Sequence, residues 1–410
     1  MRPQLVCPRL IAAEERQHRL VDHLGDGTMG FGTDHVEHLG NVGIVEIAHR
    51  PIAEDALGNG PFVQHLDMAV AHIAADGLKG GTQLPGRPFQ DLQEALARNV
   101  PDSDPYTHQQ GLPLAREAVA QFHRERGTPN AHADRVFVGN GVSELIDISL
   151  RALLNPGEEV LLPSPDYPLW SAATILNQGR PVYYRCAPEN GFLPDPDEIE
   201  KLVTPRTRAL VVINPNNPTG ASYPRALLER LVDIAARHRL LLMADEIYDG
   251  ILYDEASFTP LAPLAGDVPC LSFGGLSKVW RACGWRVGWA VLSGDPVRVG
   301  DYHHAMDLLS ALRLCANVPA QFAVPAALTG PETILELTRP GGRLHESRRA
   351  VVECCEASEH LSLVAPAGAL YAFPQVVGDA AIDFDDQAFA LELLETEDVL
   401  VVPGSGFNVP

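Results

Sequence analysis

The stretch RALVVINPNNPTGASYPRALLERLVDIAARHRLLLMADEIYDGILY (208–253) determines the fold that we expect for this chain. It begins with an apolar, β-branched run, breaks into a turn rich in Asn and Pro, and continues as a helical pattern at 224–238. A second apolar run follows and ends in Asp245 and Glu246. Two short apolar runs around a helix are typical of a βαβ unit whose strands are parallel and buried on both faces.

The same alternation extends over the middle of the chain. We expect strands near 135–138, 158–163, 208–213, 240–245 and 269–274. We expect helices at 143–154, 168–177, 196–203 and 224–238. This rhythm predicts an α/β fold with a mainly parallel sheet, which presents its ligand-binding groups at the carboxyl ends of the strands. From about residue 300, helical and then mixed α and β patterns predict a smaller second domain.

A single lysine stands out in the segment SFGGLSKVWRACGWRVGW (272–289). The chain of 410 residues has three lysines in all, and Lys278 lies here among small residues, eight positions before Arg286. A lysine that forms an imine with an aldehyde must be accessible and partly desolvated, so that its amine is neutral. An arginine nearby can bind a phosphate group with its planar, bidentate fork. A lysine in a Gly/Ser turn is, however, more often a solvated surface residue.

Three further polar residues complete a pattern that suits one cofactor. Asn217 follows the apolar run at 208–213, and Asp245 and Tyr248 follow the run at 240–245. Each has a plainer reading, because Asn and Pro form turns and acidic residues often follow buried parallel strands. Taken with Lys278, they fit pyridoxal 5'-phosphate. A carboxylate keeps the pyridine nitrogen protonated so that the ring accepts electrons, and Asn and Tyr donate to its phenolic oxygen.

On these residues the chain resembles the class I aminotransferases of PLP fold type I, and within them the bacterial alanine aminotransferase group. The resemblance begins near residue 88 and continues to the last residue. The motifs that carry it are GNGVSELI (139–146), PSPDYPLWSAA (163–173), NPNNPTG (214–220), ADEIYDGILYD (244–254), GGLSK (274–278), RLCANVPAQ (313–321), PGGRL (340–344), PAGALYAFP (366–374) and GSGFNVP (404–410).

The resemblance implies a role for each matching residue. It implies that Lys278, Asp245 and Tyr167 are catalytic, with Tyr167 stacking on the cofactor ring, and that Asn217 also binds the substrate. It implies that the phosphate lies at a glycine-containing turn that leads into a helix, where backbone amides meet a positive helix end. The implied cofactor-binding residues are Tyr106, Val142, Ser143, Tyr167, Asn217, Tyr248, Asp245, Ser277, Lys278 and Arg286. Tyr106 would reach the cofactor of a partner subunit. We interpret Trp170, Trp280, Trp285 and Trp289 as core packing.

The expected function is therefore amino transfer from L-alanine to 2-oxoglutarate in a cytoplasmic homodimer that holds no metal. A PLP-dependent β-lyase on the same scaffold and an impaired, PLP-binding remnant are the alternatives. The net charge of −22 argues against nucleic-acid and anionic-membrane partners, and no run of about 18 apolar residues suggests a membrane span. The seven cysteines are scattered without disulfide spacing, which favours a reducing compartment.

Both ends of the chain depart from the family pattern. Residues 1–87 form an atypical segment, for which a shifted reading frame is the simplest explanation and a divergent N-terminal arm is the alternative. His35 and His38 within it only superficially resemble metal spacing. We expect the large cofactor-binding domain at 88–300 and the small domain, incomplete, at 301–410. Relatives continue beyond GSGFNVP to an arginine that binds the substrate carboxylate. Its absence from this sequence predicts a poor catalyst.

Overall fold

The computed structural model describes residues 69–72, 88–397 and 399–409. All of them belong to one compact unit, Val45–Pro410. The histidine pair at His35 and His38 lies outside the described residues, as does most of the segment predicted to be atypical. None of the helices in the described part of the chain is both long and apolar enough to cross a membrane.

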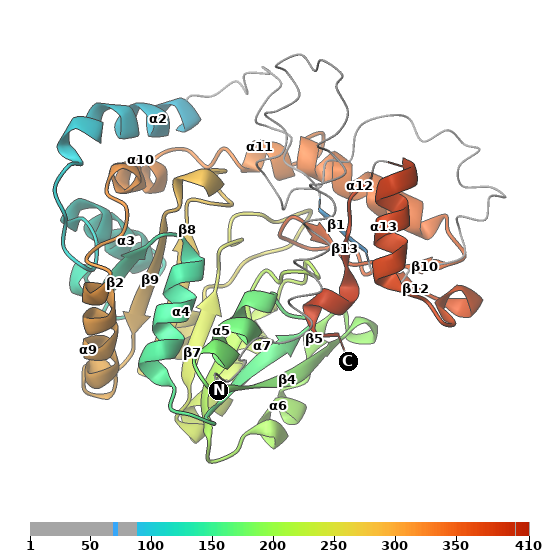
Figure 1. The fold of residues 1–410 in the computed structure, drawn as a ribbon, viewed down its shortest axis with the longest axis horizontal. Helices are drawn as coiled ribbons and strands as arrows, with labels where there is room; N and C mark the ends of the chain where they lie inside the picture. The colour runs from blue at the N-terminus through green and yellow to red at the C-terminus, as the bar shows by residue number, and fades with distance from the viewer. Residues whose placement is uncertain (1–68, 73–87, 398, 410) are drawn as a thin grey trace, which may run out of the picture. The chain divides into compact units, whose positions relative to one another are not determined.

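An eight-stranded sheet forms the centre of the fold (Figure 1). Its order is β2-β9-β8-β7-β6-β3-β4-β5. The strands are β2 (Val136–Gly139), β3 (Glu159–Ser164), β4 (Arg180–Ala187), β5 (Leu193–Pro194), β6 (Thr207–Ile213), β7 (Leu241–Asp245), β8 (Cys270–Gly275) and β9 (Gly288–Ser293). The central strands β4, β3, β6, β7 and β8 are parallel, whereas β9 and β5 pair antiparallel with their neighbours. The predicted α/β fold with a mainly parallel sheet is confirmed.

The predicted strands and helices agree with the observed ones to within two residues, but three strands of this sheet were missed. Strand β9 begins at the end of the segment 272–289, which contains Lys278, and β5 is only two residues long. Strand β4 pairs with β3 near the edge of the sheet, and four of its first five residues are not fully buried. Its sequence RPVYYRCA therefore lacks the continuous apolar run of a central strand.

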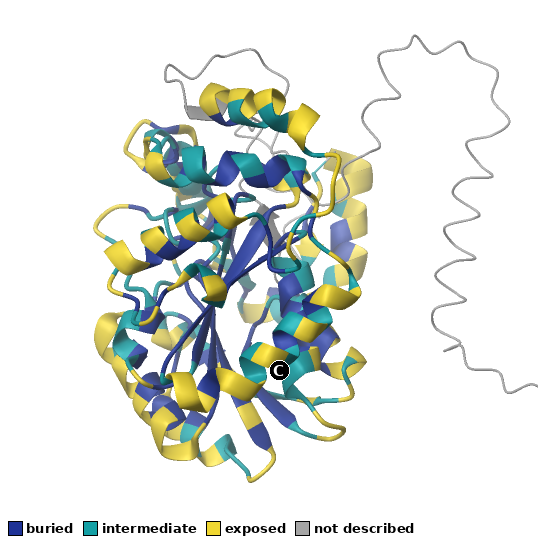
Figure 2. Cartoon of the chain, turned by 90° about the vertical axis from the view of Figure 1, so that its left-hand side faces the viewer, coloured by how far each residue is buried: buried dark blue, intermediate teal, exposed yellow. Residues whose placement is uncertain are grey.

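Alternate residues of the central strands pack into two different cores. On one face, Leu161, Leu210 and Leu242 pack with residues of α6 (Pro196–Leu202), α7 (Arg225–His238) and α8 (Leu261–Ala265). On the other face, Val160, Val211 and Met243 pack with α4 (Val142–Leu153), α5 (Pro168–Leu176) and α9 (Pro296–Leu312). Because successive side chains of a strand point to opposite faces, both faces are apolar. Figure 2 shows the buried strands with helices on both sides.

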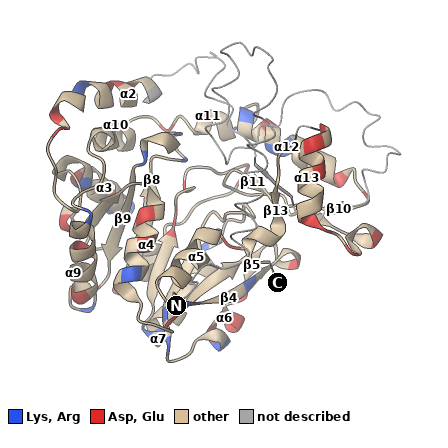
Figure 3. Cartoon of the chain, in the orientation of Figure 1, with Lys and Arg blue, Asp and Glu red and all other residues tan. Residues whose placement is uncertain are grey.

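A third core joins β2 and β9 to the helices α2 (Pro88–Asn99), α3 (Pro113–Glu125) and α10 (Val324–Thr329). The C-terminal part holds α11 (Leu335–Thr338), α12 (Arg343–Glu356) and α13 (Asp386–Glu397), with the short strands β10 (Leu361–Ser362), β11 (Tyr371–Ala372), β12 (Gln375–Val376) and β13 (Val402–Pro403). Strand β1 (Ala69–His72) pairs between β11 and β13. Figure 3 shows acidic positions along α13, whose sequence DQAFALELLETE contains no lysine or arginine.

Candidate active site

The predicted site residues follow the ends of neighbouring strands. Tyr167 follows β3, Asn217 follows β6, Asp245 ends β7, and Lys278 follows β8. These four strands are parallel, so their carboxyl ends meet at one edge of the sheet. Strand β2 runs in the same direction, because both β2 and β8 pair antiparallel with β9. The turn after β2 therefore opens at the same edge.

Asp245 is a buried carboxyl group that is only half satisfied. Its side chain is 3% exposed, and its Oδ2 accepts a hydrogen bond of 3.0 Å from Trp170 Nε1. Its Oδ1 is buried without a partner among the described residues. Burial raises the pKa of Asp245 to about 6, although the N–H of Trp170, the nearby backbone amide of Ile247 and the charge of Lys278 all act to lower it. A buried acceptor without a donor is costly, so this oxygen suits a protonated nitrogen of a ligand.

Trp170 thus does more than pack in the core. The indole is fully buried and contacts Phe273 edge to face, as core packing predicts. Its N–H also fixes the orientation of the Asp245 carboxyl group. The sequence contained no signal for this contact, because the two residues are 75 positions apart. Trp280 and Trp289 contact each other edge to face, as the core-packing interpretation predicts.

Lys278 lies beside a pair of tyrosines. Its Nζ is 5.7 Å from the centre of the Tyr248 ring. Burial lowers the pKa of Lys278, but the neighbouring side chains of Tyr371, Cys283 and Tyr167 outweigh burial and leave the pKa above its usual value. The sequence interpretation expected burial to favour the neutral amine. In the protein alone, the surrounding oxygen and sulfur atoms instead favour the ammonium form.

Tyr371 is a site residue that the sequence interpretation missed. Its hydroxyl shares a hydrogen bond with that of Tyr248, and both rings are buried and meet edge to face. The C-terminal segment reaches this position because backbone bonds join it to the loop after β7, from Tyr253 N to Ala367 O and from Ala369 N to Ile251 O. The motif PAGALYAFP contains the tyrosine, but nothing in it indicates which residue faces the site.

Hydrogen bonds of two asparagines hold the loop NPNNPTG (214–220) in shape, and the side chain of the third asparagine makes none of these bonds. Asn214 Oδ1 accepts from the Tyr223 backbone, and Asn216 Oδ1 accepts from the backbone and the hydroxyl of Thr219. Asn217 is 7% exposed, and its side chain makes no hydrogen bond within the described part of the chain. Its amide is therefore free to bind a ligand at the end of β6.

The turn after β2 places Arg286 against the start of α4. Gly141 has φ +85°, in the left-handed region that glycine adopts at little cost, and it precedes Val142 at the N-terminus of the helix. The guanidinium of Arg286 donates to Asn140 O at 3.3 Å and to Cys283 O at 3.0 Å. The side chain of Ser143 lies near that of Tyr167 and partly offsets the rise in the Tyr167 pKa that burial causes. An arginine and the amides of a helix N-terminus are thus together, which suits a phosphate group.

Tyr106 is not brought into this site within one chain. It lies in the loop before α3, and its side chain is 78% exposed. Ser277 immediately precedes Lys278, and its carbonyl accepts a hydrogen bond from the Cys283 thiol at 2.8 Å. The remaining predicted residues thus lie at the sheet edge, and Tyr106 does not contact them.

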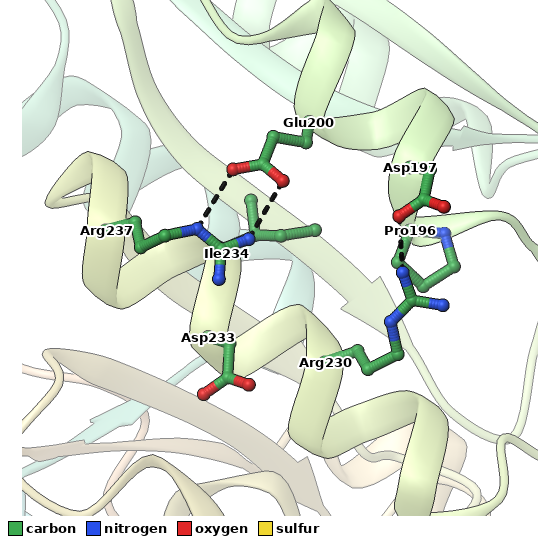
Figure 4. A pocket seen from close by; sticks show the side chains of 7 residues that line it. All are labelled: Pro196, Asp197, Glu200, Arg230, Asp233, Ile234 and Arg237. Carbon is green, nitrogen blue, oxygen red and sulfur yellow. Dashed lines mark hydrogen bonds and ion pairs between the residues drawn. The ribbon is translucent and has the colours of Figure 1, made fainter.

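One surface groove is lined by residues other than these (Figure 4). It has a volume of about 150 Å³ and lies between α6 and α7. Arg237 pairs with Glu200, and Arg230 pairs with Asp197, across the groove. Such exposed ion pairs contribute little to stability. No predicted site residue lines this groove.

The resemblance implies that this turn binds the phosphate of pyridoxal 5'-phosphate, so we expect Gly141→Ala to weaken the binding of that compound by roughly tenfold to a hundredfold. A Cβ at this position would lie 2.2 Å from Arg286 Nη2, so the guanidinium would have to move. Gly157→Ala is the matched control, because Gly157 has a similar φ of +81° but open space around its Cα. Titrating each apoprotein with pyridoxal 5'-phosphate measures the effect. Equal affinities for the two variants would contradict the assigned position of Arg286.

Comparison with known proteins agrees with this geometry. The family Aminotransferase class I and II matches residues 80–410. Glutamate-pyruvate aminotransferase AlaA of Escherichia coli K12 is 46% identical over 315 residues, which cover 77% of this chain and 78% of that protein. Alanine aminotransferase of Mycobacterium tuberculosis H37Rv is 46% identical over 331 residues, covering 80% of this chain and 76% of that protein.

Solved structures show the same similarity. An aminotransferase from Escherichia coli superimposes with a TM-score of 0.76 at 45% identity, covering 78% of this chain and 79% of that chain. Alanine aminotransferase from Pyrococcus furiosus superimposes with a TM-score of 0.72 at 35% identity, covering 78% of this chain and 80% of that chain. The residues that the family matches, 80–410, include the sheet and the strand ends described above.

Proposed function

Because the chain belongs to the class I and II aminotransferases, which depend on pyridoxal phosphate, we propose that it transfers the amino group of L-alanine to 2-oxoglutarate. The products are pyruvate and glutamate. The observation that carries the substrate assignment is the 46% identity to proteins named glutamate-pyruvate and alanine aminotransferase. The observation that carries the cofactor assignment is the buried, unpartnered Oδ1 of Asp245 at the edge of the sheet.

The residues at the sheet edge fit the parts of pyridoxal phosphate. Arg286, the helix start at Val142 and Ser143, and Ser277 would hold the phosphate. Tyr167 would stack on the ring, and Asp245 would accept a hydrogen bond from the protonated pyridine nitrogen. Asn217 and Tyr248 would donate to the phenolic oxygen, and Lys278 would bind the aldehyde carbon. When bound, the cofactor supplies an aromatic ring that takes up the electron pair left behind when the substrate loses its Cα proton.

Lys278 itself would carry out the proton transfer. Its Nζ would be the base that takes the proton from the substrate Cα and delivers it to the carbon on the other side of the substrate nitrogen. Its burial near Tyr248 and Tyr371 limits access of water, which would otherwise compete for the proton. Asp245 would remain an anion beside the ring, and the hydrogen bond from Trp170 holds its carboxyl group in place. Asn217, with its uncommitted amide, orients the substrate carboxylate.

We also propose that two copies form a dimer with shared sites. The supporting observation is Tyr106, whose ring is 78% exposed and makes no hydrogen bond or ring contact within the described residues. A two-fold axis would carry it to the partner's phosphate site and bring the partner's equivalent back. The described cysteines, among them the exposed Cys283, are free thiols, which suits a cytoplasmic location.

We expect the purified protein with pyridoxal phosphate to form pyruvate from L-alanine only when 2-oxoglutarate is present. Coupled reduction of pyruvate by a dehydrogenase measures the rate, and glutamate should appear in equal amount. L-Aspartate in place of L-alanine is the comparison and should react at least about tenfold more slowly. Pyruvate and ammonia formed without an oxo acid would instead identify a β-lyase. A faster reaction with L-aspartate would overturn the assignment of the amino donor.

A further inference from the structure

Asn317 lies in the segment RLCANVPAQ (313–321), to which neither the sequence nor the proposed mechanism gives a role. Its backbone N–H donates to Asn140 Oδ1 at 2.9 Å, and its Nδ2 contacts the same oxygen at 3.2 Å. The Nδ2 also donates to the carbonyl of Arg286 at 3.0 Å and approaches that of Trp285 at 3.4 Å. One side chain thus links the turn after β2 to the turn that carries Arg286.

The turn at Arg286 needs such a link. Arg286 has φ +52°, in the left-handed region that is unfavourable for a residue with a side chain. A conformation of this kind persists only when surrounding contacts hold it. The guanidinium makes two of those contacts, to Cys283 O and Asn140 O, and the amide of Asn317 makes the contact to the backbone carbonyl of Arg286 itself.

Asn140, at the other end of this link, is also held in place. Glu144 accepts from the backbone of Asn140 at 2.7 Å and from its Nδ2 at 3.1 Å. The Asn140 amide is therefore oriented with its nitrogen toward the carboxylate and its oxygen toward Asn317. Arg313 lies 3.5 Å from Glu144 and donates to Val138 O at 2.8 Å.

A buried glutamine anchors Asn317 itself. Gln321 is fully buried, and its Nε2 donates to Asn317 O at 2.8 Å. Its Oε1 accepts from the Leu112 backbone at 2.7 Å, just before α3. The segment 313–321 is therefore attached to rigid structure on both sides of Asn317, and it can transmit that rigidity to the Arg286 turn.

We propose that Asn317 is a positioning residue that holds Arg286 at the distance from the α4 N-terminus that a phosphate group requires. This inference rests on the phosphate-binding role of Arg286. Asn317 acts through Arg286 and does not touch the cofactor. Its removal should therefore weaken binding only of ligands that carry the phosphate.

The test compares two aldehydes in the same apoprotein. Asn317→Ala should lower the affinity for pyridoxal 5'-phosphate by about tenfold. This corresponds to the free energy of roughly one hydrogen bond, here the one that orders Arg286. The affinity for pyridoxal, which has the same ring and aldehyde without the phosphate, should not change. Asn155→Ala is the control, because Asn155 is an exposed asparagine whose amide bonds Glu158 in a turn elsewhere. It should leave both affinities unchanged.

A second comparison asks whether the effect passes through Arg286. In an Arg286→Ala background, Asn317→Ala should cause no further loss of affinity for the phosphate ester. An equal loss for both aldehydes, no loss for either, or a loss that persists without Arg286 would each overturn the proposal. Because these are binding measurements, they stand apart from the amino transfer assay. A wild-type protein that binds the cofactor but does not transaminate would refute only the proposed function.

Discussion

Replacing Lys278 with alanine is expected to lower amino transfer by about ten-thousandfold while leaving weak, non-covalent cofactor binding. The variant loses the only amine placed beside Tyr248 and Tyr371 in the described site, so no side chain there remains to move the Cα proton. Arg286, Asp245 and the start of α4 remain, so the phosphate and ring contacts persist. The rate should be measured with L-alanine and 2-oxoglutarate at saturating cofactor.

Lys201→Ala is the matched control for this variant. Lys201 lies exposed in the last turn of α6, and its replacement should not change the rate of amino transfer in the same assay. Borohydride reduction of the wild-type protein, followed by peptide mapping, should label Lys278. A label on Lys79 or Lys201 would show that another amine binds the aldehyde and that the site has been placed incorrectly.

The parallel sheet could be predicted because its strands are buried on both faces. Strands β3, β6, β7 and β8 are near-continuous apolar runs, and a polar residue marks the point where each run ends. Those polar residues, including Asp245 and Lys278, were therefore identified together with the strands. The parallel direction of the strands then brings them to one edge without any further information.

The contacts that orient these residues could not be predicted in the same way. Trp170 and Asp245 are 75 positions apart, Tyr248 and Tyr371 are 123 apart, and Asn140 and Asn317 are 177 apart. No local pattern records such a pairing, because each depends on how distant elements pack. The sequence therefore identified residues of the chemistry but not the side chains that hold them. It also could not show that Lys278 has neighbours that favour its charged form.

Asp245→Asn is expected to lower amino transfer by about a hundredfold to a thousandfold with the cofactor still bound. Asparagine keeps the shape of the side chain and an oxygen for Trp170 Nε1, but it has no negative charge to hold a proton on the ring nitrogen. Trp170→Phe is the graded comparison, because it keeps the carboxyl group and removes only the hydrogen bond that orients it. Its loss of rate should be smaller. Equal rates for Asp245→Asn and wild type would exclude Asp245 as the partner of the ring.

The pH dependence of the apoprotein provides an independent check on Asp245. Burial raises its pKa from 3.8 to about 6 in the folded protein, so the folded state binds the proton more tightly than the unfolded state between these values. The stability contributed by that proton is fully present below pH 3.8 and is lost as the pH rises through 6. At pH 7 the apoprotein of Asp245→Asn should therefore melt at a higher temperature than wild type, and the difference should shrink as the pH falls from 6 to 4.

Adding cofactor at pH 7 should stabilise wild type more than the variant, because the bound ring supplies the donor that Oδ1 lacks. The prediction is contradicted if Asp245→Asn melts at the same temperature as wild type without cofactor and gains as much in melting temperature when cofactor is added. Asp245 would then not be the group that binds the protonated ring nitrogen.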